Sequence, residues 1–442
     1  MTTNDKFGHA LSGATTETAA LYDRAQRQLL LYEGDPVATI AEAIERRPDF
    51  VMARVLHAYL HLLGARPDVA HVARGSLEAA EALPHTTREG GHLAAIRHLV
   101  EGRWHAAARA LEDVAIDHPH DILALQAGQA LDFFVGDSRM LRDRIARALP
   151  AWSPAMPDYH GVLGMHAFGL EEMGDYTAAE RAGRRAIELE PRDSWAQHAV
   201  AHVCEMQGRQ RDGIAWMRGN EDGWTRDNFF KVHNWWHLAM FHLDLGETDA
   251  VLKLYDESIY GTRTGAVLDM VDASAMLWRL ILRGVDVGGR WQGVAEDWAT
   301  LTASSNYAFN DAHAMMAFVG AGRRADGDAV LALQAAPKRD GDDNAAFIRE
   351  VGAPVTQAIR AFGDGDHGTA IRLLRPARNI AARFGGSHAQ RDLIDLTLIE
   401  SALRAGEDAL ARALTAERMA VKPSSPWNRW LADRAMARAK AA

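Results

Sequence analysis

A proline recurs about every 35 residues through the first part of the chain. Successive prolines are 36, 35, 35 and 37 residues apart, at Pro48, Pro84, Pro119, Pro154 and Pro191. Because proline cannot continue a helix, each of them marks the end of one helical unit and the start of the next. A fixed period of this length predicts a protein built from stacked repeats.

Each repeat reads as a helix, a short turn and a second helix. In the clearest one, from His160 to Asp193, apolar residues recur with a helical period up to Met173, Gly174 supplies the turn, and an alanine-rich second helix is expected over residues 177–189. Related turn phrases follow Glu101, Gly208, Gly246 and Gly365. We therefore predict an all-α, tetratricopeptide-like solenoid of helical hairpins that winds as a right-handed superhelix.

The repeats are regular over residues 1–320 and looser over residues 321–442, which we expect to continue the same solenoid. The later part contains a polar insert, Lys338–Asn344, whose glycine and aspartates predict a surface loop. Arg142, Arg144 and Arg147 fall on one predicted helix, and we expect them to form a solvated face.

The charge, the apolar runs and the cysteine content of the chain exclude several kinds of function. The formal net charge of −10 argues against a nucleic-acid footprint and against a polybasic membrane-binding surface. No apolar run approaches the roughly 20 residues that a membrane-spanning helix needs. Cys204 is the single cysteine, which excludes an intramolecular disulfide and a cysteine-based metal cage. The first residues lack the pattern of a signal peptide, so we expect a cytoplasmic protein.

Two histidine pairs set the middle of the chain apart. His198 and His202 are four residues apart, as are His233 and His237, so each pair shares one face of a helix. The offset between the pairs is 35 residues, which equals the repeat period. If the first helices of successive hairpins stack, the pairs lie side by side on the concave surface.

Other polar residues fall on the same predicted surface. Asp269 and Asp272 follow the second histidine pair by about one more period, and the next first helix contains a further polar group. Polar side chains inside an alanine- and leucine-rich array are costly unless they are paired, so their clustering is informative. The candidate ligand-binding residues are His198, Glu205, His233, Asn234, Trp236, Asp269, Asn310, His313, Gln390 and Arg391.

Three functions remain open for this surface. Histidines completed by a carboxylate could hold a divalent metal such as Zn²⁺, Fe²⁺ or Mn²⁺. The same residues could transfer protons without a metal. The surface could also be a non-catalytic groove for a peptide or protein partner. The enzyme hypothesis is a hydrolase or lyase acting on a small molecule, with the candidate catalytic residues His202, His237, Asp272 and Asp311.

In that hypothesis, His202 and His237 are metal ligands or acid/base groups, and the two aspartates orient them. Arg391 would bind an anionic group of the substrate. It follows a glycine pair at a helix start where Ser387 is the expected N-cap. Motifs of serine hydrolases, P-loop enzymes and dinucleotide-binding folds are absent in the required context.

Long phrases of the chain resemble the tetratricopeptide repeat protein 38 family, over about Arg142 to Pro426. They include DSWAQHAVAHVCEM from Asp193, VHNWWHLAMFHLDLGE from Val232, FNDAHAMM from Phe309 and GGSHAQRD from Gly385. The resemblance implies that the candidate residues above, together with Asp392, correspond to motif positions of that family. It implies no particular reaction.

Overall fold

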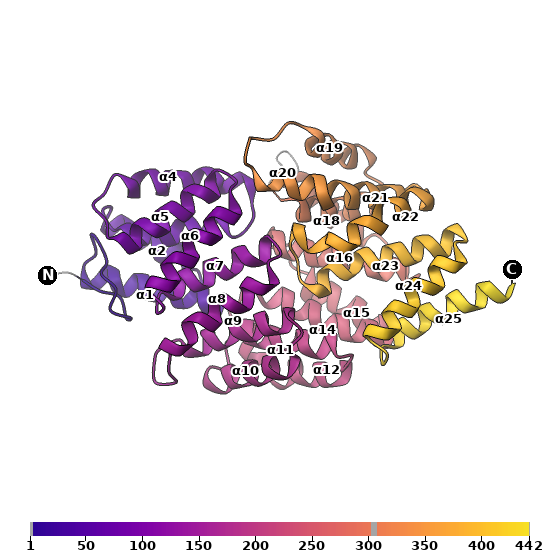
Figure 1. Cartoon of the computed structure of the whole chain (residues 1–442), viewed down its shortest axis with the longest axis horizontal. Coiled ribbons are helices and arrows are strands. Elements are labelled where there is room, and N and C mark those ends of the chain that lie inside the picture. Colours follow the sequence, from indigo (N-terminus) through magenta and orange to yellow (C-terminus); the bar gives the residue numbers. More distant parts are fainter. Residues whose placement is uncertain (1–2, 302–306, 442) are drawn as a thin grey trace. The chain divides into compact units, whose positions relative to one another are not determined.

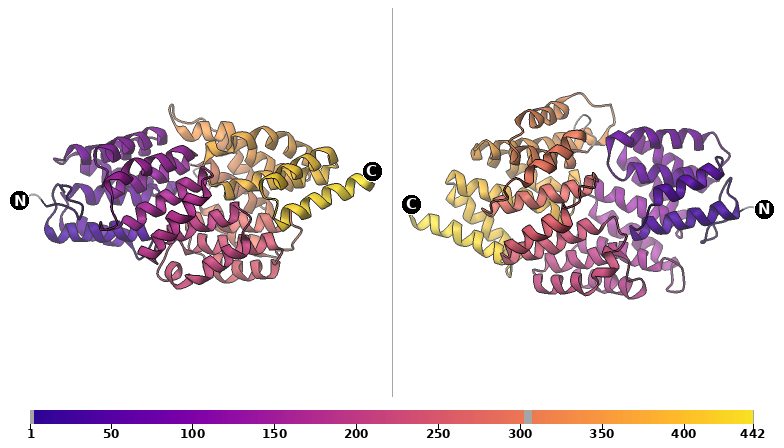
Figure 2. Two further views of the ribbon diagram at one scale, coloured as in Figure 1. Left: turned by 60° about the horizontal axis from the view of Figure 1, so that its bottom comes forward. Right: turned by 180° about the vertical axis from the view of Figure 1, so that it is seen from behind.

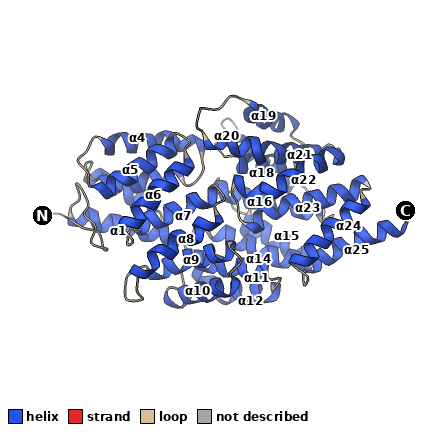
Figure 3. Ribbon diagram, viewed as in Figure 1, coloured by secondary structure: helices blue, strands red, loops and turns tan. Residues whose placement is uncertain are grey.

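The computed structural model describes residues 3–301 and 307–441 and is helical throughout them, apart from turns and loops (Figure 3). The chain forms two compact units. The first contains Met1–Val200, Asn220–Lys231 and Arg339–Asp343, and the second contains Ala201–Gly219, Val232–Lys338 and Asn344–Ala442. Three boundaries between them, after Val200, Lys231 and Asp343, fall inside continuous helices.

Helices of the first unit follow one another in hairpins, each packed on the preceding one (Figure 1). Its elements are α1 (Thr16–Leu31), α2 (Pro36–Arg46), α3 (Val51–Leu62), η1 (Pro67–Val69), α4 (Ala70–Glu81), α5 (Thr87–Val100), α6 (Trp104–Asp117), α7 (Ile122–Phe134), α8 (Ser138–Ala148), η2 (Leu149–Ala151), α9 (Tyr159–Glu172), α10 (Tyr176–Leu189), the start of α11 (Ser194–Met206) and α13 (Glu221–Thr225).

Helices of the second unit continue the hairpin pattern (Figure 2). Its elements are the end of α11, then α12 (Gln210–Gly219), α14 (Lys231–Leu245), α15 (Thr248–Leu254), η3 (Tyr255–Ile259), α16 (Val267–Leu282), α17 (Arg290–Leu301), α18 (Ala308–Gly320), α19 (Arg324–Ala335), α20 (Asp343–Phe347), η4 (Ile348–Gly352), α21 (Ala353–Gly363), α22 (His367–Ala377), η5 (Arg378–Phe384), α23 (His388–Ala405), α24 (Asp408–Val421) and α25 (Pro426–Ala441).

The proline period is confirmed by the helix boundaries, since all five prolines lie between two helices. An aspartate two residues after the proline starts the next helix in two of the repeats. Asp121 accepts a hydrogen bond from the Ala124 amide at 3.0 Å, and Asp193 accepts one from the Ala196 amide at 2.9 Å. Proline therefore ends one hairpin and the aspartate N-cap begins the next.

Four first helices of the second unit pack on one another in a closed circuit. Helix α16 contacts α18, α18 contacts α21, α21 contacts α23, and α23 contacts α16 again. The last contact includes a hydrogen bond from Trp278 Nε1 to Thr397 Oγ1 of 2.9 Å, across 119 residues of sequence. Their facing surfaces therefore form a packed interior within this unit rather than one wall of an open groove.

Two expectations about polar segments are wrong in part. Arg144 is not on a solvated face: it is 2% exposed and forms hydrogen bonds of 2.7 and 2.9 Å with Asp132. The insert Lys338–Asn344 is a loop only up to residue 342, because α20 begins at Asp343. The Asn344 side chain is buried and accepts a hydrogen bond from the Ala308 amide at 2.8 Å.

The buried pair of Arg144 and Asp132 gives a test of the first unit. Asp132→Ala leaves the guanidinium buried without its carboxylate, and we expect a loss of about 3–5 kcal/mol in the free energy of unfolding. The double variant Asp132→Leu/Arg144→Met should recover most of this loss. Arg147→Met, on the exposed side of the same helix, should change stability by less than about 0.5 kcal/mol. Urea titrations followed by circular dichroism would measure all three, and an unchanged Asp132→Ala variant would contradict the assignment.

Candidate metal centre

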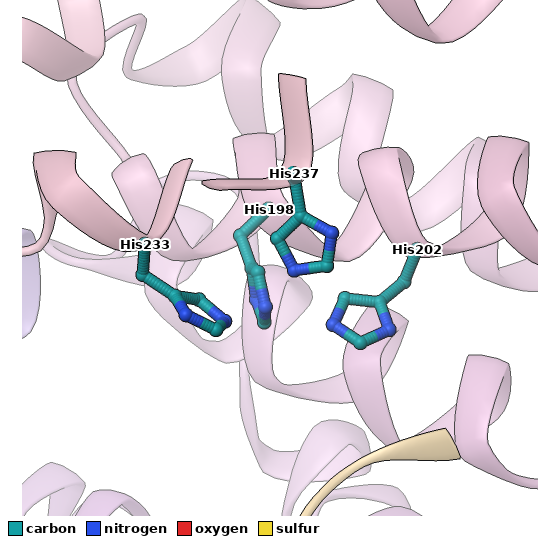
Figure 4. Close-up of side chains that lie close together, drawn as sticks. All are labelled: His198, His202, His233 and His237. Carbon is teal, nitrogen blue, oxygen red and sulfur yellow. The ribbon is translucent and has the colours of Figure 1, made fainter. Parts of the chain in front are cut away.

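Helices α11 and α14 bring four histidines together. Figure 4 shows their rings gathered in one place, and one ligand nitrogen of each lies within 4.8 Å of the others. The four side chains, His198, His202, His233 and His237, are between 0% and 4% exposed. His202, His233 and His237 belong to the second unit, and His198 precedes His202 by one turn of the same helix. The convergence expected from the 35-residue offset is thus present.

Ring contacts fix the orientation of these imidazoles. The ring centroids of His202 and His237 are 4.4 Å apart, and those of His233 and His237 are 4.9 Å apart at an interplanar angle of 90°. Trp236 stacks on His233 with an interplanar angle of 9°. The indole therefore covers one face of a histidine and keeps its ring in place.

Asp272 of α16 holds His233 in one tautomer. Its carboxylate oxygens lie 3.0 and 2.8 Å from His233 Nδ1, so the Nδ1–H donates and Nε2 keeps its lone pair. Asp272 is fully buried, which raises the pKa of its carboxyl, while His233 acts in the opposite direction. A carboxylate behind the second ring nitrogen is the usual arrangement around a metal-bound histidine.

Glu205 of α11 gives His237 a similar but looser contact. Its Oε2 lies 3.4 Å from His237 Nδ1, and its Oε1 lies 3.7 Å from Lys422 Nζ. Burial lowers the pKa of both His202 and His237 well below the usual value, and neighbouring histidines lower it further. Both rings are therefore neutral at pH 7, which is the form that binds a metal ion.

The donor set fits a transition-metal ion. With metal–nitrogen bonds of about 2.1 Å, two ligand atoms can be at most about 4.2 Å apart. The four nitrogen atoms lie within 4.8 Å of one another, so side-chain rotations would have to bring them closer to bind one ion together. Imidazole suits Zn²⁺, Fe²⁺, Cu²⁺ or Ni²⁺ and not Mg²⁺ or Ca²⁺, which prefer oxygen ligands.

Several other predicted site residues have partners of their own. Asp269 accepts a hydrogen bond of 2.5 Å from Thr264 Oγ1, and Asp311 accepts one of 3.0 Å from Gln334 Nε2. His313 Nδ1 donates to the Phe309 carbonyl at 2.8 Å. Asn234 is buried on α14, and Asn310 is partly exposed at the start of α18.

The expected N-cap at Ser387 is confirmed. Its hydroxyl accepts a hydrogen bond from the Gln390 amide, and Gln390 Oε1 accepts one from the Ser387 amide at 3.0 Å. The Gln390 side chain thus helps to start α23. Arg391 donates to the Gly386 carbonyl and lies 3.4 Å from His388 Nδ1. The Gln390 side chain is therefore part of the cap of α23, and Arg391 contacts the loop before this helix.

A buried arginine near the cluster is not among the residues that the sequence pattern predicts for the site. Arg279 of α16 is 0% exposed, and its guanidinium lies 5.2 Å from the centre of the Trp236 ring. The signal was present as an arginine inside the apolar run AMLWRLIL. A charge in such a run is rare without a specific role.

Comparisons with known proteins add little. No family model matches the chain. One solved structure, described as Naa15/Naa10 bound to HypK-THB, aligns with 96% of this chain and 68% of its own, with 11% identity and a TM-score of 0.26. A TM-score this low supports no inference about function. Among the described residues, no helix combines the length and hydropathy that a membrane crossing requires.

The buried histidines predict a pH dependence of stability. His202 and His237 have lowered pKa values in the folded state, so stability is full above about pH 6.5 and is lost as the pH falls. Each should cost about 2 kcal/mol between pH 6.5 and pH 5, because only the unfolded chain takes up the proton.

Urea unfolding of chelator-treated protein at pH 7.5 and pH 5 would measure this. His202→Gln should lose about 2 kcal/mol less than the wild type over this range. His71→Gln, which changes an exposed histidine, should lose as much as the wild type. Equal losses for the wild type and His202→Gln would show that His202 is not buried in its neutral form.

Proposed function

We propose that this chain binds one transition-metal ion at His198, His202, His233 and His237 and uses it as a hydrolase or lyase on a small molecule. One observation carries the proposal: four buried imidazoles converge, and two of them have a carboxylate at Nδ1. Asp272 differs from Asp121 and Asp193, which also contact a histidine, because those two cap the start of a helix and Asp272 does not.

The coordination number decides what the ion can do. Tetrahedral Zn²⁺ bound by all four histidines would have no position left for water or substrate, which is the arrangement of a structural site. A six-coordinate ion such as Fe²⁺ or Ni²⁺ would keep two positions open. Such an ion would supply Lewis acidity at this place. Glu205 would accept a proton there, and Asp272 would keep His233 in its binding tautomer.

The alternative function is a non-catalytic scaffold that holds a peptide or protein partner in a concave groove. The closed circuit of α16, α18, α21 and α23 disfavours it, because an open groove would need these first helices to face solvent. The family resemblance and the cytoplasmic location remain predictions alongside this proposal. They name no substrate and do not distinguish the two functions.

Elemental analysis of purified protein tests the metal site. Protein prepared without a histidine tag should contain about one transition-metal ion per chain and lose it to a strong chelator. His202→Ala and His233→Ala should each remove most of the metal. A matched control is His57→Ala/His61→Ala, which removes the i,i+4 pair of α3, whose Nε2 atoms are 3.3 Å apart. If this control loses the metal and the cluster variants keep it, the assignment is wrong.

Asp272→Asn tests the orienting carboxylate. The amide keeps the size of the side chain but weakens its hold on the His233 tautomer, and we expect metal affinity to fall about 10- to 100-fold. Competition with a metal-sensitive dye would measure the change. Thr264→Val, which removes the hydroxyl from Asp269 on the same helix, should leave affinity unchanged. An affinity equal to the wild type in Asp272→Asn would remove Asp272 from the site.

A metabolite-library turnover screen tests catalysis. Metal-loaded wild type should convert at least one small molecule that His237→Ala does not convert. Products that form equally with both proteins would show that the histidine cluster is not the catalytic site.

A further inference from the structure

Arg279 is a buried cation without an ion-pair partner. It is 0% exposed, and no described carboxylate oxygen lies within 4.0 Å of its guanidinium. The carboxylates that act on its charge from a greater distance are engaged elsewhere: Asp392 pairs with Arg418 at 3.1 Å, Glu205 lies 3.7 Å from Lys422 Nζ, and Asp272 binds His233. Removing a charge from water without a counter-charge is costly, so a lone buried arginine needs an explanation.

One of its three nitrogen atoms also has no hydrogen-bond partner. A guanidinium has five N–H groups in a fixed plane. Nη2 donates to the Ala389 carbonyl at 2.5 Å, and Nη1 donates to the Ala275 carbonyl at 3.3 Å. The Nε atom is buried and has no hydrogen-bond partner. Backbone carbonyls hold the side chain in position but do not neutralise its charge.

Two further buried polar atoms near Arg279 lack partners. One is Nε1 of Trp236, the indole over which the guanidinium lies, and the other is Nε2 of His313. Burial, with a smaller contribution from the charge of Arg279, lowers the pKa of His313 to about 4, so this ring is neutral and its Nε2 can accept a hydrogen bond. A buried polar group without a partner is unfavourable, and a polar ligand at this place would supply the missing hydrogen bonds.

Arg279 also lies beside the histidine cluster. It follows Asp272 by seven residues, two turns along the same face of α16. Its neighbour Trp236 precedes His237 directly and stacks on His233. A small ligand held at Arg279 would therefore lie next to the ion-binding histidines.

We propose that Arg279 binds an oxyanion, a carboxylate or phosphate group of the small molecule on which the histidine cluster acts. This inference rests on the proposed function for the identity of the site, but the binding of the anion does not need a metal. The planar fork of arginine matches both groups with two parallel hydrogen bonds. Trp236 Nε1 supplies a third donor, and His313 Nε2 accepts from a hydroxyl of the same ligand.

Thermal unfolding of the chelator-treated, full-length protein tests the anion site. Phosphate and malonate are the two probes, and chloride at matched ionic strength is the reference. A ligand at about ten times its Kd should raise the wild-type midpoint by about 1–3 °C. A rise with phosphate but not with malonate would indicate that the natural ligand is a phosphate ester. A rise with malonate but not with phosphate would indicate a carboxylic acid.

Three variants test whether Arg279 is the residue that binds the anion. Arg279→Met keeps the length of the side chain and removes the buried charge, so it should fold with an equal or higher midpoint in chloride and show no rise with either anion. Arg279→Lys keeps the charge but lacks the planar pair of N–H donors, and it should weaken anion binding at least about tenfold. Arg283→Met, one turn along, removes an arginine stacked on Trp427 and should keep the full rise.

Several results would overturn the inference. One is that neither anion raises the midpoint of the wild type. Another is that the anions raise the midpoint of Arg279→Met as much as that of the wild type. If Arg279→Met does not fold, an undiminished rise in Arg279→Lys has the same meaning. A rise seen only with metal present would place the anion on the ion instead of Arg279. A rise in metal-free protein that never binds metal would keep the anion site and remove the proposed metal chemistry.

Discussion

A histidine–aspartate contact between neighbouring first helices recurs along the chain. His92 lies 3.0 Å from Asp121, His160 lies 2.8 Å from Asp193, and His233 lies 2.8 Å from Asp272. In the first two, the aspartate also caps the start of its helix, so the contact fixes where one hairpin meets the next. Asp272 lies inside α16 and caps nothing, which makes the third copy the one suited to orient a ligand.

The parts of the structure that depend on local chemistry were predictable from the sequence. Proline, glycine and aspartate act within a few residues, so the hairpin boundaries and the turn at Gly174 followed from spacing alone. The convergence of the two histidine pairs followed as well. It requires only that helices α11 and α14 stack with the repeat period, which places residues 35 apart side by side.

Buried charges were not predictable, because their partners are set by the packing of distant segments. Arg144 lies near two arginines that are partly or largely exposed, and only the position of Asp132 on the preceding helix makes it a buried residue. Arg279 donates to a carbonyl 110 residues away on α23. The spacing of residues in a single sequence does not indicate a contact between such distant segments, although an arginine in an apolar run indicates that some partner exists.

The closed circuit of α16, α18, α21 and α23 changes how this part of the chain can fold. In an open solenoid each repeat touches only its neighbours, so folding can start anywhere and repeats can be gained or lost. Here the packing of α16 is complete only when α23, which lies more than a hundred residues further along the chain, is in place. Such long-range closure slows folding, because distant segments must meet before their contacts form. These four helices of the second unit therefore share one packed interior, as in a globular domain, and do not contact only their neighbours in sequence as the units of an open repeat protein do.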